Sequence, residues 1–224
     1  MKRSEINNYI EAAIDLFEEY KYPLPHFAYM TPEELKELRA TGNSDEIFKC
    51  ALGWDVTDFG STDFYKRGLL LFTVRNGKVG TKYTKPYAEK LMVVEVGQVT
   101  PYHYHTYKQE DIINRGGGNL IIQAYNSSKN NEKLNSDITV SIDGTERIFK
   151  AGERIIIEPG CSICLPQKLY HTFYGEEQTT IVGEVSMVND DNTDNCFYET
   201  LPRFSEIIED DEPIHLLSQD YANI

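Results

Sequence analysis

Short segments rich in β-branched and aromatic residues follow one another from Asp55 to about residue 205, with no helical stretch between them. Turn residues separate these segments, and the pairs Asn76-Gly77 and Asp143-Gly144 are typical of tight hairpins. Strands joined by short turns pair in antiparallel order, so the region predicts an all-β sandwich or barrel. The expected strands are 69–75, 78–84, 90–96, 120–125, 138–142, 147–149, 154–157, 171–174 and 179–188.

Two helices are expected before the strands. Residues 4–20 carry an apolar stripe of helical spacing, with Ser4 as a candidate N-cap. A second helix is predicted to begin at Thr31-Pro32, because a capping threonine precedes a proline at the first helical position and Glu34 completes a capping box. Gly42 marks its expected end.

The length of 224 residues fits one domain with a core of its own. We expect residues 1–54 to form a helical extension packed on the outside of a β-barrel of residues 55–205. Residues 206–224 form an acidic tail, whose charge run Glu209–Glu212 is expected to be a solvated face.

The net charge of −14 argues against a nucleic-acid partner, because phosphate binding requires a basic face. No apolar run approaches the roughly 20 residues that span a bilayer, and the first residues do not resemble a signal peptide. Only four cysteines occur, which favours reduced thiols over a disulfide framework. These features predict a cytoplasmic protein with no membrane partner.

Two histidines and a carboxylate occur at metal-ligand spacing near the middle of the chain. His103 and His105 point to the same face of an extended strand, because side chains repeat with period two. Glu110 lies just past a bend, from which it can turn back toward that face. Two imidazoles and a carboxylate suit a borderline divalent ion, with Mn²⁺ as the first expectation and Zn²⁺, Fe²⁺, Co²⁺ and Ni²⁺ as alternatives.

The fourth candidate ligand is His171, the best placed of the other three histidines. It follows a short apolar run that ends at Pro166 and opens a strand-like stretch. His26 lies in a proline-rich segment near the amino end, and His215 lies in the acidic tail.

These segments together resemble the cupin family. The first cupin motif is matched at Gly97, His103, His105, Glu110 and Gly116. The second is matched at Gly160, Pro166 and His171, whereas Lys168 replaces its glycine and Gly175 its asparagine. The resemblance implies a jelly-roll barrel with a metal held by the three histidines and Glu110.

A narrower resemblance points to cupin-type D-lyxose isomerases. It is carried by the stretch from His103 to Leu120, by Gly183 to Asp191, and by Asp194-Asn195. The resemblance implies a metal-dependent aldose–ketose isomerase that interconverts D-lyxose and D-xylulose, and also D-mannose and D-fructose. A homodimer is expected as well, because cupins commonly pair through edge strands.

Four further residues are candidates for proton transfer or substrate binding: Lys108, Glu184, Lys90 and Arg203. Lys108 lies between two expected ligands, although a lysine in a bend is often only solvated. Glu184 interrupts an apolar strand, where an unpaired carboxylate is costly. Lys90 has a weaker claim because it can simply start an edge strand, and Arg203 binds either the far end of a sugar or a surface carboxylate.

More than one function fits the sequence, because the cupin fold alone does not select a reaction. A sugar-phosphate isomerase requires a basic cluster, for which Lys108 and Lys168 are candidates. An Fe²⁺ dioxygenase or a non-catalytic sugar-binding cupin could use the same metal ligands. For the isomerase itself, proton transfer through an enediol and a direct hydride shift both fit the sequence.

Overall fold

The structure, a computed structural model, describes residues 1–188 and 193–224. Its helices are α1 (Arg3–Glu19), η1 (His26–Tyr29), α2 (Pro32–Ala40), α3 (Asp45–Lys49) and η2 (Ser218–Asn223). Its strands are β1 (Gly53–Thr57), β2 (Leu69–Arg75), β3 (Tyr87–Val94), β4 (His103–His105), β5 (Glu110–Gly116), β6 (Asn119–Ser127), β7 (Lys133–Leu134), β8 (Ile138–Ile142), β9 (Thr145–Phe149), β10 (Ile155–Ile157), β11 (Ser162–Leu165), β12 (Leu169–Glu176), β13 (Thr180–Met187) and β14 (Asn195–Phe197).

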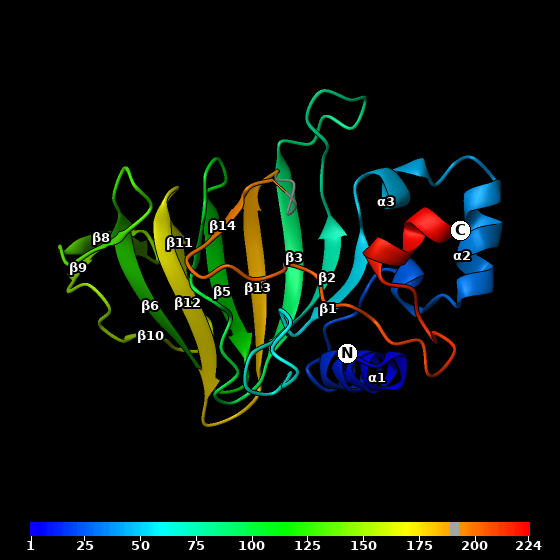
Figure 1. The fold of residues 1–224 in the computed structure, drawn as a ribbon, viewed down its shortest axis with the longest axis horizontal. Coiled ribbons are helices and arrows are strands. Elements are labelled where there is room, and N and C mark those ends of the chain that lie inside the picture. The colour runs from blue at the N-terminus through cyan, green and yellow to red at the C-terminus, as the bar shows by residue number, and fades with distance from the viewer. Residues whose placement is uncertain (189–192) are drawn as a thin grey trace.

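These strands form two antiparallel sheets that face each other. The larger sheet has eight strands in the order β1-β2-β3-β13-β5-β11-β8-β9. The smaller sheet has the order β10-β6-β12-β4-β14, with β7 paired to β6. The helices gather at one end of this β-structure, beside β1 and β2 (Figure 1). The predicted all-β architecture is therefore present, and strands distant in sequence become neighbours.

The core of the barrel follows from the alternation of side chains along the strands. On β2, Leu69 and Leu71 point into the barrel, whereas Leu70 and Phe72 belong to a second cluster on the outer face. The same alternation continues on the neighbouring strands β3 and β13. Burial of each apolar side chain of this size stabilises the fold by about 1.5–3 kcal/mol. Apolar packing on both of its faces therefore stabilises the larger sheet.

The outer cluster is covered by α1. Its apolar stripe of Ile6, Ile10, Ala13 and Phe17 is buried against the outer face of the larger sheet. Trp54 on β1 holds η1, the segment that follows α1, because its indole N–H donates to the Ala28 carbonyl at 2.8 Å. This arrangement supports an N-terminal extension packed outside the barrel. The division at residues 54 and 205 stays a prediction, and β1 begins at Gly53, slightly earlier than that boundary.

The start of α2 is the one expected from the sequence. Thr31 Oγ1 accepts a hydrogen bond from the Glu34 backbone N–H at 3.3 Å, and Glu34 accepts one from the Thr31 backbone N–H at 2.8 Å. The helix ends at Ala40, and Gly42 follows with a φ of +72°. The prediction for α1 was wrong at its cap: Lys2 is the N-cap, and Ser4 lies inside the helix.

The acidic tail returns to α1. Arg3, only 2 % exposed, forms ion pairs with Glu209 at 2.7 Å and with Asp220 at 3.0 Å. Ser4 donates to Asp210 through both its backbone N–H and its hydroxyl. The charge run is exposed as expected, but Glu209 and Asp210 are not merely solvated, because they bind the first turn of α1.

Two hairpin signals had different outcomes. Asp143-Gly144 joins β8 to β9 with φ values of 48° and 76°, which confirms a tight turn. Asn76-Gly77 does not form a tight hairpin turn. The strand predicted for 78–84 is absent from the described chain. Gly77 instead permits close packing, since a Cβ there would lie 2.0 Å from the Lys85 carbonyl oxygen. The chain makes a long loop before β3 begins at Tyr87.

No helix in the described parts of the chain is long and apolar enough to cross a membrane. The four cysteines are free thiols. The elements that the sequence analysis missed are short: η1, α3, β1, β5, β7, β11, β14 and η2.

Candidate metal and sugar site

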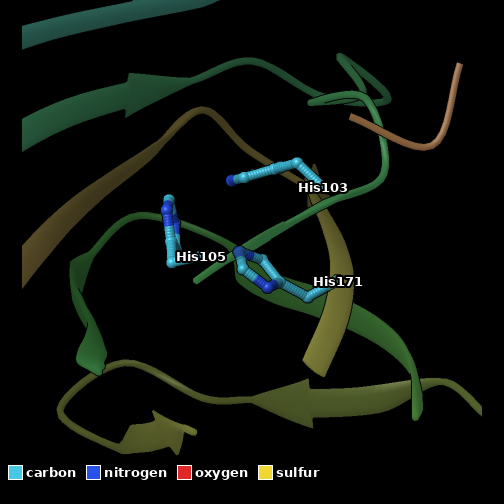
Figure 2. A group of neighbouring side chains, drawn as sticks. All are labelled: His103, His105 and His171. Carbon is cyan, nitrogen blue, oxygen red and sulfur yellow. The ribbon is translucent and has the colours of Figure 1, made fainter. Parts of the chain in front are cut away.

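Three histidines meet inside the barrel. His103 and His105 lie at the two ends of β4, and His171 on β12 is paired in register with His103. One ligand nitrogen from each ring lies within 4.8 Å of the others. The three side chains surround a common space, as Figure 2 shows. Tyr104 points to the opposite face of β4 and packs on Tyr170, with ring centroids 4.7 Å apart.

Glu110 reaches this space from the other sheet, as the first residue of β5. Its Oε1 lies 3.1 Å from His171 Nε2 and 3.5 Å from His105 Nε2. His171 Nε2 nevertheless has no hydrogen-bond partner among the described residues, so the 3.1 Å approach lacks hydrogen-bond geometry. Ligand nitrogens and oxygens that lie close together without hydrogen bonds between them are the arrangement expected around a shared cation.

Two of the rings are held by carbonyl groups. His103 Nδ1 lies 2.8 Å from the Pro101 carbonyl oxygen, and His171 Nδ1 lies 3.0 Å from that of Leu169. A carbonyl can only accept, so each Nδ1 carries the proton and each Nε2 offers its lone pair to the centre. The His105 ring is not held by a carbonyl in this way; its Nδ1 faces Asp194 Oδ2 at 3.9 Å.

The protonation states suit a divalent ion. Burial, together with the neighbouring histidines, lowers the pKa of His103 well below its ordinary value. Burial and the Lys108 ammonium lower the pKa of His105. Burial alone would raise the pKa of Glu110, but Lys108 and His105 hold it well below its usual range. Neutral imidazoles and an ionised carboxylate are the forms that bind metal, so these residues fit a cation such as Mn²⁺ or Zn²⁺.

A buried charge network adjoins the histidines. Lys108 Nζ lies 2.6 Å from Glu110 Oε2 and 2.8 Å from Glu184 Oε1. Glu184 also lies 3.5 Å from Lys90 Nζ and accepts a hydrogen bond from the Ser186 hydroxyl at 2.8 Å. Burial would raise the pKa of Glu184, but Lys108 and Lys90 lower it. Glu184 is therefore an ionised carboxylate within the cavity.

Arg203 lines the same cavity from the segment after β14. It pairs with Asp55 on β1 at 2.5 Å and is 11 % exposed. Its guanidinium carbon lies 5.9 Å from the centre of the Phe59 ring. Arg203 is thus not a surface residue, and the surface ion pair considered for it is wrong.

The cavity combines these polar groups with an apolar wall. Its described lining includes the three candidate groups Lys90, Lys108 and Glu184, and its apolar side chains are Phe59, Leu69, Leu71, Met92, Ile112, Phe173 and Phe197. A mostly apolar pocket with a few convergent polar groups is typical of a small-molecule site. The structure therefore places Lys90, Lys108, Glu184 and Arg203 around one cavity beside the four expected metal ligands, whereas Lys168 lies outside it.

The family model for D-lyxose isomerase matches residues 1–221. The chain belongs to the D-lyxose isomerase family. It is 47 % identical over 220 residues to a D-lyxose/D-mannose isomerase of Escherichia coli O157:H7, which covers 97 % of this chain and 96 % of the relative. It is 46 % identical over 224 residues to a D-lyxose/D-mannose isomerase of Serratia proteamaculans, covering 99 % and 98 %. Membership of this family confirms the resemblance and the prediction of a sugar isomerase.

Solved structures of L-ribose isomerases share the fold. The Acinetobacter sp. DL28 enzyme, in complex with L-ribose, has a TM-score of 0.58 at 15 % identity and covers 89 % of this chain and 93 % of that one. The Cellulomonas parahominis enzyme with L-ribose has a TM-score of 0.55 at 14 % identity, covering 88 % and 93 %. These neighbours and the two curled antiparallel sheets confirm the predicted cupin barrel.

Some functional residues were not singled out from the sequence. Ser186 lies within the second family stretch but was not singled out, and Asp55 carries no motif; their contacts are with Glu184 and Arg203. The period-two position of Ser186 relative to Glu184 is a further signal that could have found it. Asn189, Asp190 and Asp191, which belong to the second family stretch, lie outside the described residues.

Proposed function

We propose that the protein is a metal-dependent aldose–ketose isomerase that interconverts D-lyxose and D-xylulose, and D-mannose and D-fructose. The observation that carries the proposal is that Glu110 lies between a cluster of three histidines and a buried Lys108–Glu184 pair. The names of the Escherichia coli and Serratia relatives support this choice of sugars.

His103, His105, His171 and Glu110 would hold the ion. When bound, a divalent cation supplies a Lewis acid that polarises a carbonyl and a neighbouring hydroxyl oxygen. Mn²⁺ is our first choice of metal, and Zn²⁺, Fe²⁺, Co²⁺ and Ni²⁺ suit the same donors.

In this proposal the chain moves a proton between C2 and C1 of the aldose. The Glu184 carboxylate removes the proton from C2, giving an enediol, exchanges it with solvent and delivers a proton to C1. Lys108, at 2.8 Å from that carboxylate, exchanges a proton with the sugar oxygens as O1 becomes a hydroxyl and O2 a carbonyl. Lys90 keeps Glu184 ionised, and the Arg203 guanidinium binds hydroxyls at the far end of the sugar.

The charges of the cavity favour an unphosphorylated sugar. Within the described lining, Lys90 and Lys108 face Glu184 and Glu110, and Arg203 faces Asp55. A phosphate would therefore compete with carboxylates that are already in place. Lys168, the other candidate for phosphate binding, is exposed and uses its backbone N–H to donate to the His105 carbonyl at 2.9 Å.

The assembly is proposed to be a homodimer. The outer face of β3 and β13 supports this, because Tyr87, Val185 and Met187 are each more than 40 % exposed there. Sedimentation of the purified protein tests this proposal, and a monomer at micromolar concentration would oppose it. A cytoplasmic location stays a prediction, supported by the free cysteines.

The deciding experiment compares metal-stripped protein with protein reloaded with Mn²⁺. Ketose formation is followed from D-lyxose, D-mannose and mannose 6-phosphate. Turnover of the two free sugars only with metal supports the proposal, and turnover of the phosphate ester alone opposes it. Consumption of O₂ would indicate a dioxygenase, and binding without turnover a sugar-binding module. Deuterium from D₂O should enter the ketose at C1, whereas complete retention of the substrate hydrogen indicates a hydride shift.

The ligand assignment has its own variant. His103→Ala should lose both Mn²⁺ binding and turnover, and His26→Ala is the matched control because His26 is a histidine on η1, outside the barrel. Stoichiometric metal and normal turnover in His103→Ala would overturn the ligand assignment.

A further inference from the structure

We infer that Asp194 is a positioning residue, which holds the 106–108 turn where the metal site and Lys108 require it. The inference rests on the proposed function, in that it explains how the proposed site is kept in shape. Asp194 is only 4 % exposed on its side chain, and it comes directly before β14, the edge strand beside β4.

The contacts of Asp194 cover the whole turn. Its Oδ1 accepts a hydrogen bond from the Tyr107 backbone N–H at 2.8 Å, and its Oδ2 accepts one from that of Lys108 at 3.2 Å. Its own carbonyl accepts one from the Thr106 N–H at 3.3 Å. Three consecutive backbone donors are thus satisfied by one residue, which fixes the path of the chain there.

This turn is where precision matters most in the site. It joins His105 at the end of β4 to Glu110 at the start of β5, so its path sets the distance between these two candidate ligands. It also sets the starting point of Lys108, whose ammonium must lie between Glu110 and Glu184. A shift of the turn would therefore move a ligand and the proposed proton donor together.

Asp194 also lies near the ring of His105. The Nδ1 atoms of His103 and His171 are each held by the carbonyl two residues earlier, but within residues 1–188 and 193–224 His105 Nδ1 has no hydrogen-bond partner. Asp194 Oδ2 faces that atom at 3.9 Å, which is beyond hydrogen-bond range. The carboxylate is thus a negative charge close to this imidazole and not a hydrogen-bond partner, so its contacts with the turn carry the inference.

The test replaces Asp194 with asparagine, which keeps one acceptor and removes the charge. Asp194→Asn should weaken Mn²⁺ binding, measured by calorimetry, by about tenfold or more, because the turn that orients His105 and Glu110 is held less firmly. Amide exchange of Tyr107 and Lys108, followed by NMR on metal-free protein, should accelerate by about tenfold or more. At saturating Mn²⁺, kcat should fall while KM for D-lyxose changes little.

The matched control is Asp143→Asn. Asp143 Oδ1 likewise accepts from a backbone N–H, that of Ser162 at 2.8 Å, but in an exposed turn away from the histidines. Mn²⁺ affinity and exchange in Asp194→Asn equal to those of this control would overturn the inference. If Asp194→Asn does not fold, amide exchange is measured on the wild-type protein instead. Tyr107 and Lys108 amides that exchange there as fast as amides without a hydrogen bond would also overturn the inference. A wild type without isomerase activity would oppose the proposed function, while the exchange and Mn²⁺ measurements would still decide the role of Asp194.

Discussion

Lys108 and Glu184 form a buried ion pair of 2.8 Å, although 76 positions separate them in the sequence. Lys108 comes from the turn after β4 in the smaller sheet, and Glu184 comes from β13 in the larger one. The pair therefore links the two sheets at the point where the candidate metal ligands converge. A lysine and a carboxylate at this distance can pass a proton to a sugar that lies beside both.

Glu184→Gln should keep fold and metal but lower kcat by about a hundredfold or more, as expected for a lost general base. The glutamine can still accept from the Ser186 hydroxyl, so the strand should not move. Steady-state kinetics with D-lyxose measures the effect. Glu89→Gln is the matched control, because Glu89 is on the adjacent strand but pairs with Arg75 at 3.1 Å outside the cavity. A Glu184→Gln enzyme with near-normal kcat would make Glu184 structural and leave Lys108 as the better candidate.

Lys108→Met should lower kcat by about a hundredfold or more and should also destabilise the metal-free protein by roughly 3 kcal/mol. The cause is that Glu110 and Glu184 lose the ammonium that lies between them. Mn²⁺ should restore part of the stability, because the ion supplies positive charge near Glu110. Urea denaturation with and without Mn²⁺ measures this, with the exposed Lys66→Met as control. Unchanged stability and turnover in Lys108→Met would refute the proposed role.

Acid should destabilise the metal-free protein, beginning near pH 6.5. The folded protein holds the pKa of His103 and His105 below the ordinary value of 6.5 and that of Glu110 well below 4.5. Below each ordinary value the unfolded chain takes up a proton that the folded chain does not, so stability falls as the pH falls. Each group adds about 1 kcal/mol per pH unit over its window. Above pH 6.5 these groups have no effect.

Urea denaturation in chelator across about pH 8 to pH 5 measures this dependence. His103→Gln should reduce the slope below pH 6.5, whereas His26→Ala should keep that part of it. Stability that stays constant or rises on going from neutral to acidic pH would contradict the prediction.

Arg3→Met should lower the free energy of unfolding by about 1–3 kcal/mol without changing kcat. The Arg3 side chain is buried and loses charged hydrogen bonds to Glu209 and Asp220. Arg75→Met is the control, since its ion pair with Glu89 is half exposed and should be worth less than about 1 kcal/mol. Equal stability of the two variants would show that the tail does not hold α1.

Local signals predicted local structure well. The capping box at Thr31 and the turn at Asp143-Gly144 depend on neighbouring residues only, and both are present. Asn76-Gly77 carried an equally strong turn signal, yet the glycine serves a contact with Lys85 in the same long loop. Lys168 shows the converse case. It stands where the cupin motif has glycine and adopts a φ of 60°, so the backbone shape persists without the residue that favours it.

The site was predictable where a motif or a period fixes it. Period two predicted that His103 and His105 share a face, and the pairing of β4 with β12 brings His171 opposite them. Asp194, Ser186 and Asp55 could not be ranked from the sequence in this way, because their partners are set by the tertiary fold. The sequence likewise does not show that Lys90 and Glu184 pair with each other, because this depends on β3 and β13 being neighbours in the sheet.

The contact of the tail with α1 has a consequence for the order of folding. The first turn of α1 emerges early during synthesis, but the partners of Arg3 lie 206 and 217 positions later. The ionic partners of this helix are therefore absent while the barrel strands are being made, and only its apolar stripe can hold it against them. During synthesis, the C-terminal segment can therefore dock onto Arg3 only after all the barrel strands have been made.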